Sequence, residues 1–298
     1  MRVVAHLSDL HFGRTDPATL PALANAVAAA KPDVVVVCGD LTQRAHTSEF
    51  EEARRFLDTL PQPQIIVPGN HDVPLYNVIS RWLVPLDNFR RCISKDLAPF
   101  YADDEIAILG INTARSWTFK NGRVNRDQVT RGCARLALGG ERVTRIVVTH
   151  HPYDVSGTED DGNIVGRAQM AMAGFAQCHV DMILSGHLHV GHIGQSATRY
   201  KIPRHSALVV RSGTATSSRR RGENNSFNII TIDRPRVRID RLIWDGTSFA
   251  LSETEHFEFA LDGWFRVADH NIAERTGRAA LPEELNSGVP EQPPEENK

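Results

Sequence analysis

Short runs of apolar, mostly β-branched residues recur along the chain, and this recurrence constrains the fold more than any other feature of the sequence. Eight such runs span four to six residues each and are bounded by turn-forming residues: Val3–Leu7, Val34–Cys38, Ile65–Pro68, Ile106–Ile111, Ile146–Thr149, Met182–Ser185, Leu208–Arg211 and Phe227–Ile232. Continuous apolar runs of this length are typical of strands that are covered on both faces. We therefore expect sheets that are buried between other layers.

Helix-like stretches separate many of these runs: Ala18–Ala30, Ser48–Leu60, Asp127–Leu138 and Arg167–Cys178. Ser48 followed by Glu51 has the spacing of a capping box, and Gly139-Gly140 supplies a helix stop. Strands that alternate with helices in this way predict an α/β layered domain.

The predicted domain covers residues 1–268 and ends in a different pattern. Arg236–Leu242 and Thr254–Phe259 alternate charged and apolar residues at period two and flank Asp245-Gly246. This pattern predicts that residues 236–260 form an antiparallel hairpin that closes a sheet.

Two other segments depart from the alternation. Residues 73–100 form an insertion with aromatic and basic side chains, for which we weigh a lid over the site, a helix packed on the sheet and a homodimer contact. Its distinctive residues are Tyr76, Trp82, Phe89, Arg90 and Arg91. Residues 269–298 are acidic and rich in proline near their end, which predicts a partly disordered tail.

Charge and hydropathy exclude several classes of protein. There are 34 basic and 36 acidic residues, a net charge of −2, which does not favour binding to a nucleic-acid polymer. The longest apolar run, Val34–Cys38, is far shorter than the roughly 18 residues that cross a bilayer. His6 and Asp9 interrupt the N-terminus before a secretory signal could form, so we expect a cytoplasmic protein.

We expect its four cysteines, Cys38, Cys92, Cys133 and Cys178, to be free thiols, because no C-x-x-C pair occurs.

Metal-ligating residue types follow five of the predicted strands. The motifs are Asp9-Leu10-His11, Gly39-Asp40, Gly69-Asn70-His71-Asp72, His150-His151-Pro152 and Gly186-His187-Leu188-His189. Ligand sites in open α/β sheets lie outside the carboxyl ends of the strands, so we expect these side chains to share one rim. Carboxylate, amide and imidazole donors suit divalent metal ions, and their number exceeds what one ion can coordinate. The sequence therefore predicts a site for two metals.

In their order along the chain, the motifs resemble those of the calcineurin-like metallophosphoesterases, and the resemblance covers residues 3–192. Gly39-Asp40-Leu41-Thr42 and Thr149-His150-His151-Pro152 resemble the bacterial class III cyclic-nucleotide phosphodiesterase and glycerophosphodiesterase branch. The resemblance implies an α/β fold, a four-layer αββα sandwich of two mixed sheets. Gln43 stands where that branch usually has a second acid, so we expect the surroundings of the leaving group to differ.

The resemblance also implies the ligand set. One metal is expected to be held by Asp9, His11 and His189, the other by Asn70, His150 and His187, with Asp40 between them. We expect manganese, iron or zinc, since nitrogen and oxygen donors accept all three. Two cations lower the pKa of a bridging water towards about 7, so hydroxide is available to attack phosphorus.

Other residues are expected to act on the substrate. His71 is the candidate general acid or phosphate donor, and Asp72 is expected either to fix the tautomer of His71 or to cap the turn. Asn70 and His71 are expected to contact the substrate. The loop with Arg219, Arg220 and Arg221 either grips a second phosphate or is a solvated basic loop.

The leading interpretation is a phosphodiesterase that hydrolyses a small soluble diester, either a cyclic nucleotide or a glycerophosphodiester. One alternative is a pyrophosphatase acting on a UDP-lipid such as UDP-2,3-diacylglucosamine, which would bring the protein to a membrane surface. A second alternative is a non-catalytic scaffold with this fold. Nuclease action is disfavoured by the charge balance.

Overall fold

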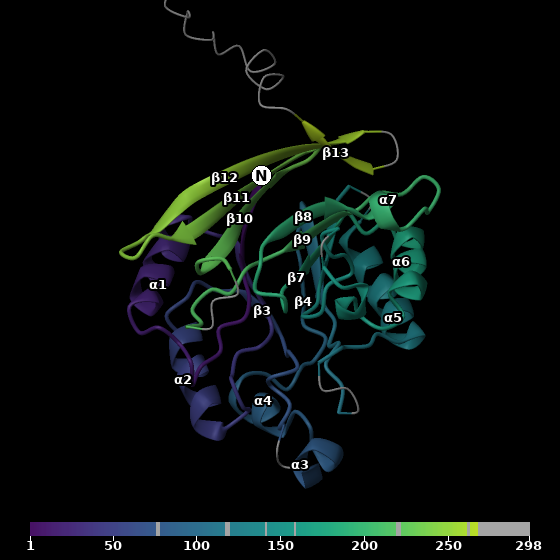
Figure 1. The fold of residues 1–298 in the computed structure, drawn as a ribbon. Helices are drawn as coiled ribbons and strands as arrows, with labels where there is room; N and C mark the ends of the chain where they lie inside the picture. Colours follow the sequence, from purple (N-terminus) through teal and green to yellow (C-terminus); the bar gives the residue numbers. More distant parts are fainter. Residues whose placement is uncertain are drawn as a thin grey trace, which may run out of the picture. The chain divides into compact units, whose positions relative to one another are not determined.

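The predicted strands assemble into two mixed sheets in the computed structural model of the protein, which describes residues 1–75, 78–116, 120–140, 142–157, 159–218, 222–260 and 263–267 (Figure 1). The first sheet has the order β13 (Gly263–Val267), β12 (Phe249–Ala260), β11 (Arg236–Trp244), β10 (Ser226–Asp233), β1 (Arg2–Leu7), β2 (Val34–Cys38) and β3 (Gln64–Val67). Strands β1, β2 and β3 run parallel, and β10 pairs antiparallel with β1.

The second sheet has the order β4 (Phe100–Ala102), β5 (Ile106–Gly110), β6 (Thr144–Val148), β7 (Met182–Ser185), β9 (Leu208–Arg211) and β8 (His192–Gln195). Its four central strands are parallel, and β4 and β8 pair antiparallel at the edges. Sequence analysis did not predict β4, β8 or β13 as strands.

Apolar side chains of the two sheets form the central core of Met1–Arg266, the first of two compact units. Val34 and Val36 of β2 face this core, whereas Val35 and Val37 face the helices on the outer side. Both sets of side chains in one strand are therefore buried, which explains its uninterrupted apolar sequence.

Helices cover the outer face of each sheet. The first sheet packs against α1 (Thr19–Ala29), α2 (Thr47–Leu57) and α4 (Asp87–Cys92), and the second against α5 (Arg126–Leu136) and α6 (Ala168–Gln177). Two shorter helices are α3 (Val78–Leu83) and α7 (Ser196–Arg199). This order of layers confirms the predicted αββα sandwich.

The start of α2 differs from the prediction. Its N-terminal carboxylate is Glu49, which accepts hydrogen bonds from the backbone N–H groups of Arg44 at 2.8 Å and His46 at 3.2 Å. The helix begins at Thr47, so the predicted capping box at Ser48 and Glu51 was wrong by two residues.

The cysteines also differ from the prediction. Cys133 of α5 and Cys178, the residue after α6, form a disulfide that joins the two helices, while Cys38 and Cys92 are free thiols. Sequence spacing could not reveal this pair, because 45 residues separate the two cysteines and only helix packing brings them together.

Residues 236–260 form two paired strands, β11 and β12, in antiparallel register from Arg236 opposite Glu258 to Trp244 opposite Phe249. In the 73–100 insertion, Phe89 is fully buried and its ring centroid lies 6.3 Å from that of Phe50 in α2. Part of the insertion therefore packs on the fold, and its role as a lid or a dimer contact stays a prediction. Tyr76 and the 269–298 tail lie outside the described residues.

Candidate metal centre

The loops that follow β1, β2 and β7 place their polar residues in an uncommon backbone conformation. Asp9, His11, Asp40, His187 and His189 all have positive φ angles, between 51° and 78°. The left-handed region costs free energy for residues other than glycine, and such residues cluster at functional sites. Here the conformation turns side chains from both sheets towards a common point.

One group of donors consists of Asp9, His11 and His189, all buried. The Nε2 atoms of the two imidazoles lie 3.1 Å apart. Oδ1 of Asp9 lies 3.6 Å from Nε2 of His11 and 3.4 Å from Nε2 of His189. Three ligand atoms thus converge on one small volume.

A second group consists of Asn70, His150 and His187. Nε2 of His150 lies 3.0 Å from Oδ1 of Asn70 and 3.1 Å from Nδ1 of His187. Nδ1 of His150 donates to the backbone carbonyl of Cys38 at 2.7 Å in the tautomer that this contact favours. That hydrogen bond leaves the lone pair of Nε2 directed at the centre.

Asp40 lies between the two groups. Its Oδ2 is 3.4 Å from Nε2 of His150 and 3.8 Å from Nε2 of His11. Its Oδ1 accepts a hydrogen bond from the backbone N–H of His71 at 2.8 Å. The carboxylate is almost fully buried and faces donors of both groups.

Close packing of glycine backbone makes this convergence possible. A Cβ on Gly69 would come within 2.1 Å of Oδ1 of Asp40, and a Cβ on Gly186 within 1.6 Å of Oγ of Ser8. Gly39 combines a φ of +78° with backbone contact to Gly69. The separate loops therefore come this close together only because all three positions are glycine, which has no Cβ.

Hydrogen bonds fix the orientation of Asp9. Its Oδ2 accepts from Oγ of Ser8 at 2.5 Å and from the backbone N–H of His187 at 2.9 Å. Thr214 donates through Oγ1 to the backbone carbonyl of Asp9 at 2.7 Å. These contacts leave Oδ1 directed at the imidazoles. Sequence analysis missed both hydroxyl residues, because no motif marks them.

Electrostatics of the centre favour positive charge. Burial opposes ionisation of both Asp9 and Asp40. The positive charge of His189 beside Asp9, and of His150 beside Asp40, outweighs burial and holds the pKa of each carboxyl well below its ordinary value. Burial likewise opposes the charged form of His150, but Asp40 raises its pKa to about 9. Burial and the neighbouring His150 lower the pKa of His187 to about 3.

The donors fit a pair of metal ions. Oδ1 of Asp9, which faces the imidazoles of His11 and His189, is buried and has no hydrogen-bond partner among the described residues. In both groups two imidazole nitrogens lie 3.1 Å apart, a separation compatible with two ligands on one ion at metal–nitrogen distances of about 2.0–2.1 Å. The ligand atoms of Asp9, His11 and His189 lie within 4.8 Å of one another, as do those of Asp9, Asp40 and His150. Their N/O character suits Mn, Fe or Zn.

His71 and Asp72 have separate roles in the structure. Nδ1 of His71 lies 2.8 Å from the backbone carbonyl of Gln43, so this carbonyl fixes the ring. Asp72 instead accepts from the backbone N–H groups of Leu41, Thr42 and Gly69. Asp72 thus holds the turn, the second of the two roles expected for it. Nδ1 of His71 instead contacts Gln43, through the backbone carbonyl and, at 3.4 Å, through the side-chain Nε2.

His151 lies beside the centre with both nitrogens engaged. Nδ1 is 2.8 Å from Oγ1 of Thr113, and Nε2 is 3.0 Å from the carbonyl of Lys120. These contacts leave no lone pair for a metal and agree with its expected place outside the ligand set.

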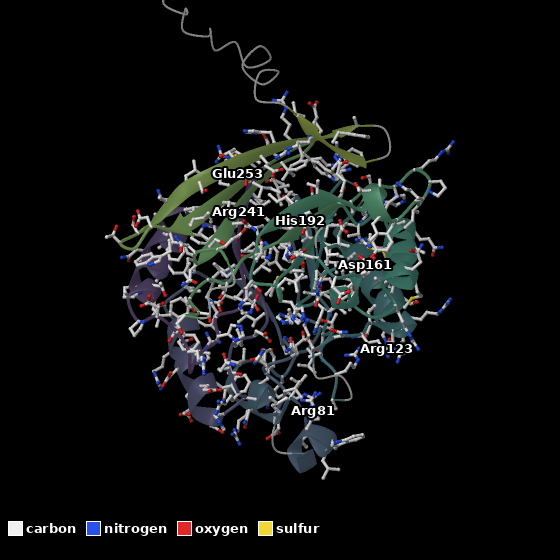
Figure 2. The ribbon with its side chains drawn as sticks, viewed as in Figure 1. Arg81, Arg123, Asp161, His192, Arg241 and Glu253 are labelled. Atoms are coloured by element: carbon white, nitrogen blue, oxygen red, sulfur yellow. A yellow bond between two sulfur atoms is a disulfide. The ribbon has the colours of Figure 1, made fainter. Side chains whose placement is uncertain are left out.

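The loop after His189 is held from two sides. Nε of buried Arg211 donates to the carbonyl of Val190 at 2.8 Å, and the guanidinium pairs with Glu159. Arg241 lies against Gly191 and pairs with Glu253 at 3.4 Å (Figure 2). Sequence analysis did not single out Arg211, because an arginine at the end of a strand does not by itself indicate which groups it will contact.

The arginines proposed to grip a second phosphate, Arg219, Arg220 and Arg221, lie outside the described residues. The structure therefore leaves their role as predicted from sequence.

The centre and the fold agree with comparisons to known proteins. A model of the calcineurin-like phosphoesterase family matches residues 2–191. The chain belongs to this family.

Individual relatives are more distant. A glycerophosphodiester phosphodiesterase, GpdQ, of Enterobacter lignolyticus (strain SCF1) is 33% identical over 173 residues. The match covers 53% of this chain and 60% of that protein, less than two thirds of its length.

Solved structures share the fold at low identity. A dimetal phosphatase from Danio rerio has a TM-score of 0.58 at 13% identity, covering 87% of this chain and 99% of that one. Purple acid phosphatase PPD1 from yellow lupin (Lupinus luteus) seeds has a TM-score of 0.59 at 14% identity. The match covers 85% of this chain and 53% of that one. Among the described residues, no helix has both the length and the apolar character needed to cross a bilayer.

Proposed function

We propose that the protein is a dimetal phosphodiesterase that hydrolyses a small soluble phosphodiester, with a glycerophosphodiester as the first candidate and a cyclic nucleotide as the second. The observation that carries the proposal is the position of Asp40, whose carboxylate faces donors of both ligand groups and binds the backbone of His71. Similarity to a glycerophosphodiester phosphodiesterase supports the choice of substrate.

Seven residues would hold the metals: Asp9, His11 and His189 for one, Asn70, His150 and His187 for the other, and Asp40 for both. When bound, the two ions supply Lewis acidity, which activates water and neutralises charge on the phosphate. Manganese, iron and zinc are all compatible with this donor set.

The protein's own residues would orient the ester and move a proton. The Nδ1–H···O=C contact with Gln43 holds the His71 ring, so that in the protonated imidazole the hydrogen on Nε2 would be the transferable proton. As the P–O bond to the leaving group breaks and water adds to phosphorus, His71 would donate that proton to the leaving alkoxide. The side-chain amide of Asn70 would donate to a phosphate oxygen.

Metal content and turnover together test the proposal. We expect purified protein to bind about two metal ions per chain and to hydrolyse bis-p-nitrophenyl phosphate, with activity lost on chelation and restored by Mn²⁺. Stoichiometric binding of two metals without turnover of any diester would instead support a scaffold.

Comparison of natural substrates tests the finer choice. We expect glycerophosphodiesters to be hydrolysed faster than cAMP, and UDP-2,3-diacylglucosamine to resist hydrolysis. Hydrolysis of the UDP-lipid alone would replace the proposed substrate by the pyrophosphatase alternative.

A further inference from the structure

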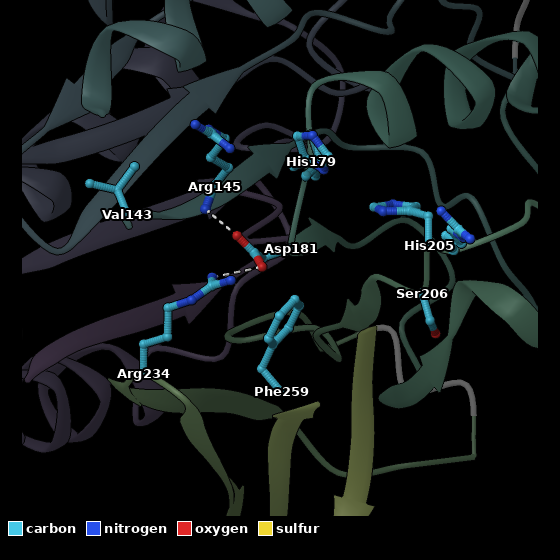
Figure 3. A pocket seen from close by; sticks show the side chains of 10 residues that line it. Val143, Arg145, His179, Asp181, His205, Ser206, Arg234 and Phe259 are labelled. Carbon is cyan, nitrogen blue, oxygen red and sulfur yellow. Dashed lines mark hydrogen bonds and ion pairs between the residues drawn. The ribbon is translucent and has the colours of Figure 1, made fainter. Parts of the chain in front are cut away.

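A second concave site lies at the opposite end of the second sheet from the metal centre. A cavity of about 580 Å³ opens between the starts of β6, β7 and β9 and the turn that joins β10 to β11 (Figure 3). Its volume falls within the roughly 300–1,000 Å³ of small-molecule sites.

Parallel strands separate this cavity from the metal centre. Arg145, near the start of β6, lines the cavity, whereas His150 follows the end of the same strand. At roughly 3.3 Å per residue, the five intervening steps place them about 16 Å apart. The amino ends of β6, β7 and β9 therefore carry a site distinct from the one at their carboxyl ends.

The residues lining the cavity are predominantly basic. Arg145, Arg204 and Arg234 line it together with His179 and His205, against a single described carboxylate, Asp181. Even with both imidazoles neutral, these side chains sum to a charge of +2. Such a concentration of like charge in one concave surface attracts anions.

Asp181 is already occupied by fixed donors. Its Oδ1 accepts from Nη1 of Arg234 at 2.9 Å and from Nε1 of Trp264 at 3.1 Å, and its Oδ2 accepts from the backbone N–H of Arg145 at 2.9 Å. The guanidinium of Arg234 also lies 4.3 Å from the ring centre of Phe259. Asp181 and Phe259 thus hold Arg234 at the wall, and the carboxylate of Asp181 offsets the charge of this one arginine.

Other donors in the cavity lack partners. Nε of Arg145, Nε2 of His205 and Oγ of Ser206 have no hydrogen bond among the described residues, whereas Nη2 of Arg145 donates to the carbonyl of Gly140 at 2.7 Å. Polar atoms without partners cost free energy, which a hydrogen bond to a bound anion would recover. Figure 3 shows that His205 and Ser206 line the side of the cavity away from Arg145 and Arg234.

We propose that this cavity binds a small anion with at least two phosphoryl groups. One phosphoryl group would face Arg145 and Arg234, and the other would face Arg204, His205 and Ser206. Guanidinium groups match phosphate oxygens with two parallel hydrogen bonds, and the two sets of donors on facing walls favour a bisphosphate over a single phosphate.

Calorimetric titration with methylenediphosphonate tests this site, because its P–C–P linkage resists hydrolysis at the metal centre. The metal-loaded full chain would be titrated in parallel as wild type, Arg204→Gln and Arg55→Gln. Arg204 lines the cavity and is exposed, whereas Arg55 is exposed on α2, so that Arg55→Gln removes the same charge elsewhere.

Besides binding at the metal centre, we expect wild type to show a binding event that Arg204→Gln weakens by about 10- to 100-fold and Arg55→Gln leaves unchanged. Orthophosphate should bind this site more weakly than methylenediphosphonate. Both variants should keep the melting temperature and diester turnover of wild type, because neither residue belongs to the metal centre.

Equal affinity of wild type and Arg204→Gln for every binding event would overturn the proposal. Equal loss in both variants would show a non-specific effect of net charge and would overturn it too. Neither result bears on the proposed phosphodiesterase activity, which is measured separately on bis-p-nitrophenyl phosphate.

Discussion

His71 contacts the metal centre through its backbone and the main chain of Gln43 through its ring. The backbone N–H binds Asp40, while Nδ1 binds the carbonyl of Gln43. Removal of the imidazole therefore leaves the backbone contact to Asp40 in place.

We predict that His71→Ala lowers kcat for bis-p-nitrophenyl phosphate by about 10²- to 10⁴-fold, the contribution of a general acid, while both metals stay bound. Metal content by plasma mass spectrometry and steady-state kinetics would be measured together. His179→Ala, an exposed histidine at the other end of the sheet, should match wild type. Unchanged kcat in His71→Ala would remove this residue from the mechanism.

The residue types of the centre were predictable from sequence, but their orientation was not. Each motif follows an apolar run, so the motif positions indicated Asp40 and His150 as neighbours. The main-chain contact of His71 was not predictable, because the backbone carbonyl at position 43 is present whatever the side chain. The same limit applies to Ser8 and Thr214, whose hydroxyls orient Asp9.

Among the elements, buried strands were predictable and edge strands were not. Met182–Ser185 was predicted with its observed bounds because all four residues are buried. His192–Gln195 is half-exposed along its length and contains a glycine, so it shows neither an apolar run nor alternation. Its pairing with β9 depends on tertiary contact.

The turn after β7 depends on the absence of a side chain at Gly186. We predict that Gly186→Ala lowers the free energy of unfolding by about 1–3 kcal/mol and reduces metal content, because a Cβ would collide with Ser8 and displace Asp9. Urea unfolding and metal analysis would measure both effects. Gly157→Ala is the matched control, since nothing lies within 4 Å of its Cβ position. Equal stability and metal content in the two variants would contradict this account of the turn.

Across the molecule, an ion pair joins the two sheets. Arg2 of β1 donates through Nε to Oδ2 of Asp103 at 2.7 Å, and Asp103 follows β4. Burial opposes ionisation of Asp103, but hydrogen bonds from the backbone of Glu105 and Ile106 and from Arg2 lower its pKa to about 2. The folded pKa thus lies below the unfolded value of about 3.9.

A carboxyl with a depressed pKa stabilises the fold above its unfolded pKa and loses that contribution as pH falls through its folded pKa. We predict that Asp103→Asn lowers the free energy of unfolding at pH 7 by about 1 kcal/mol, after solvent screening of the pair, and that the difference from wild type shrinks between pH 4 and pH 2. Urea unfolding across this range would measure it. Asp104→Asn, exposed one residue away, should follow wild type; a difference that is constant with pH would contradict the assignment.

Metals would also cross-link the sheets. Asp9 and Asp40 follow strands of the first sheet, and His150 and His187 follow strands of the second. A ligand that binds only the folded state stabilises it by mass action, by about 2.7 kcal/mol at a hundred times its dissociation constant. We therefore predict that dialysis against a chelator lowers the melting temperature and that Mn²⁺ restores it.

Asp40→Ala isolates the contribution of the bridging position to this stability. Without that carboxylate, the variant should lose metal and turnover together, and its melting temperature should respond weakly to either chelator or Mn²⁺. Differential scanning calorimetry and metal analysis on the same samples would measure both. Full occupancy by two metals in Asp40→Ala would show that the two sites form without a shared carboxylate, each ion being held by its own group of three ligands.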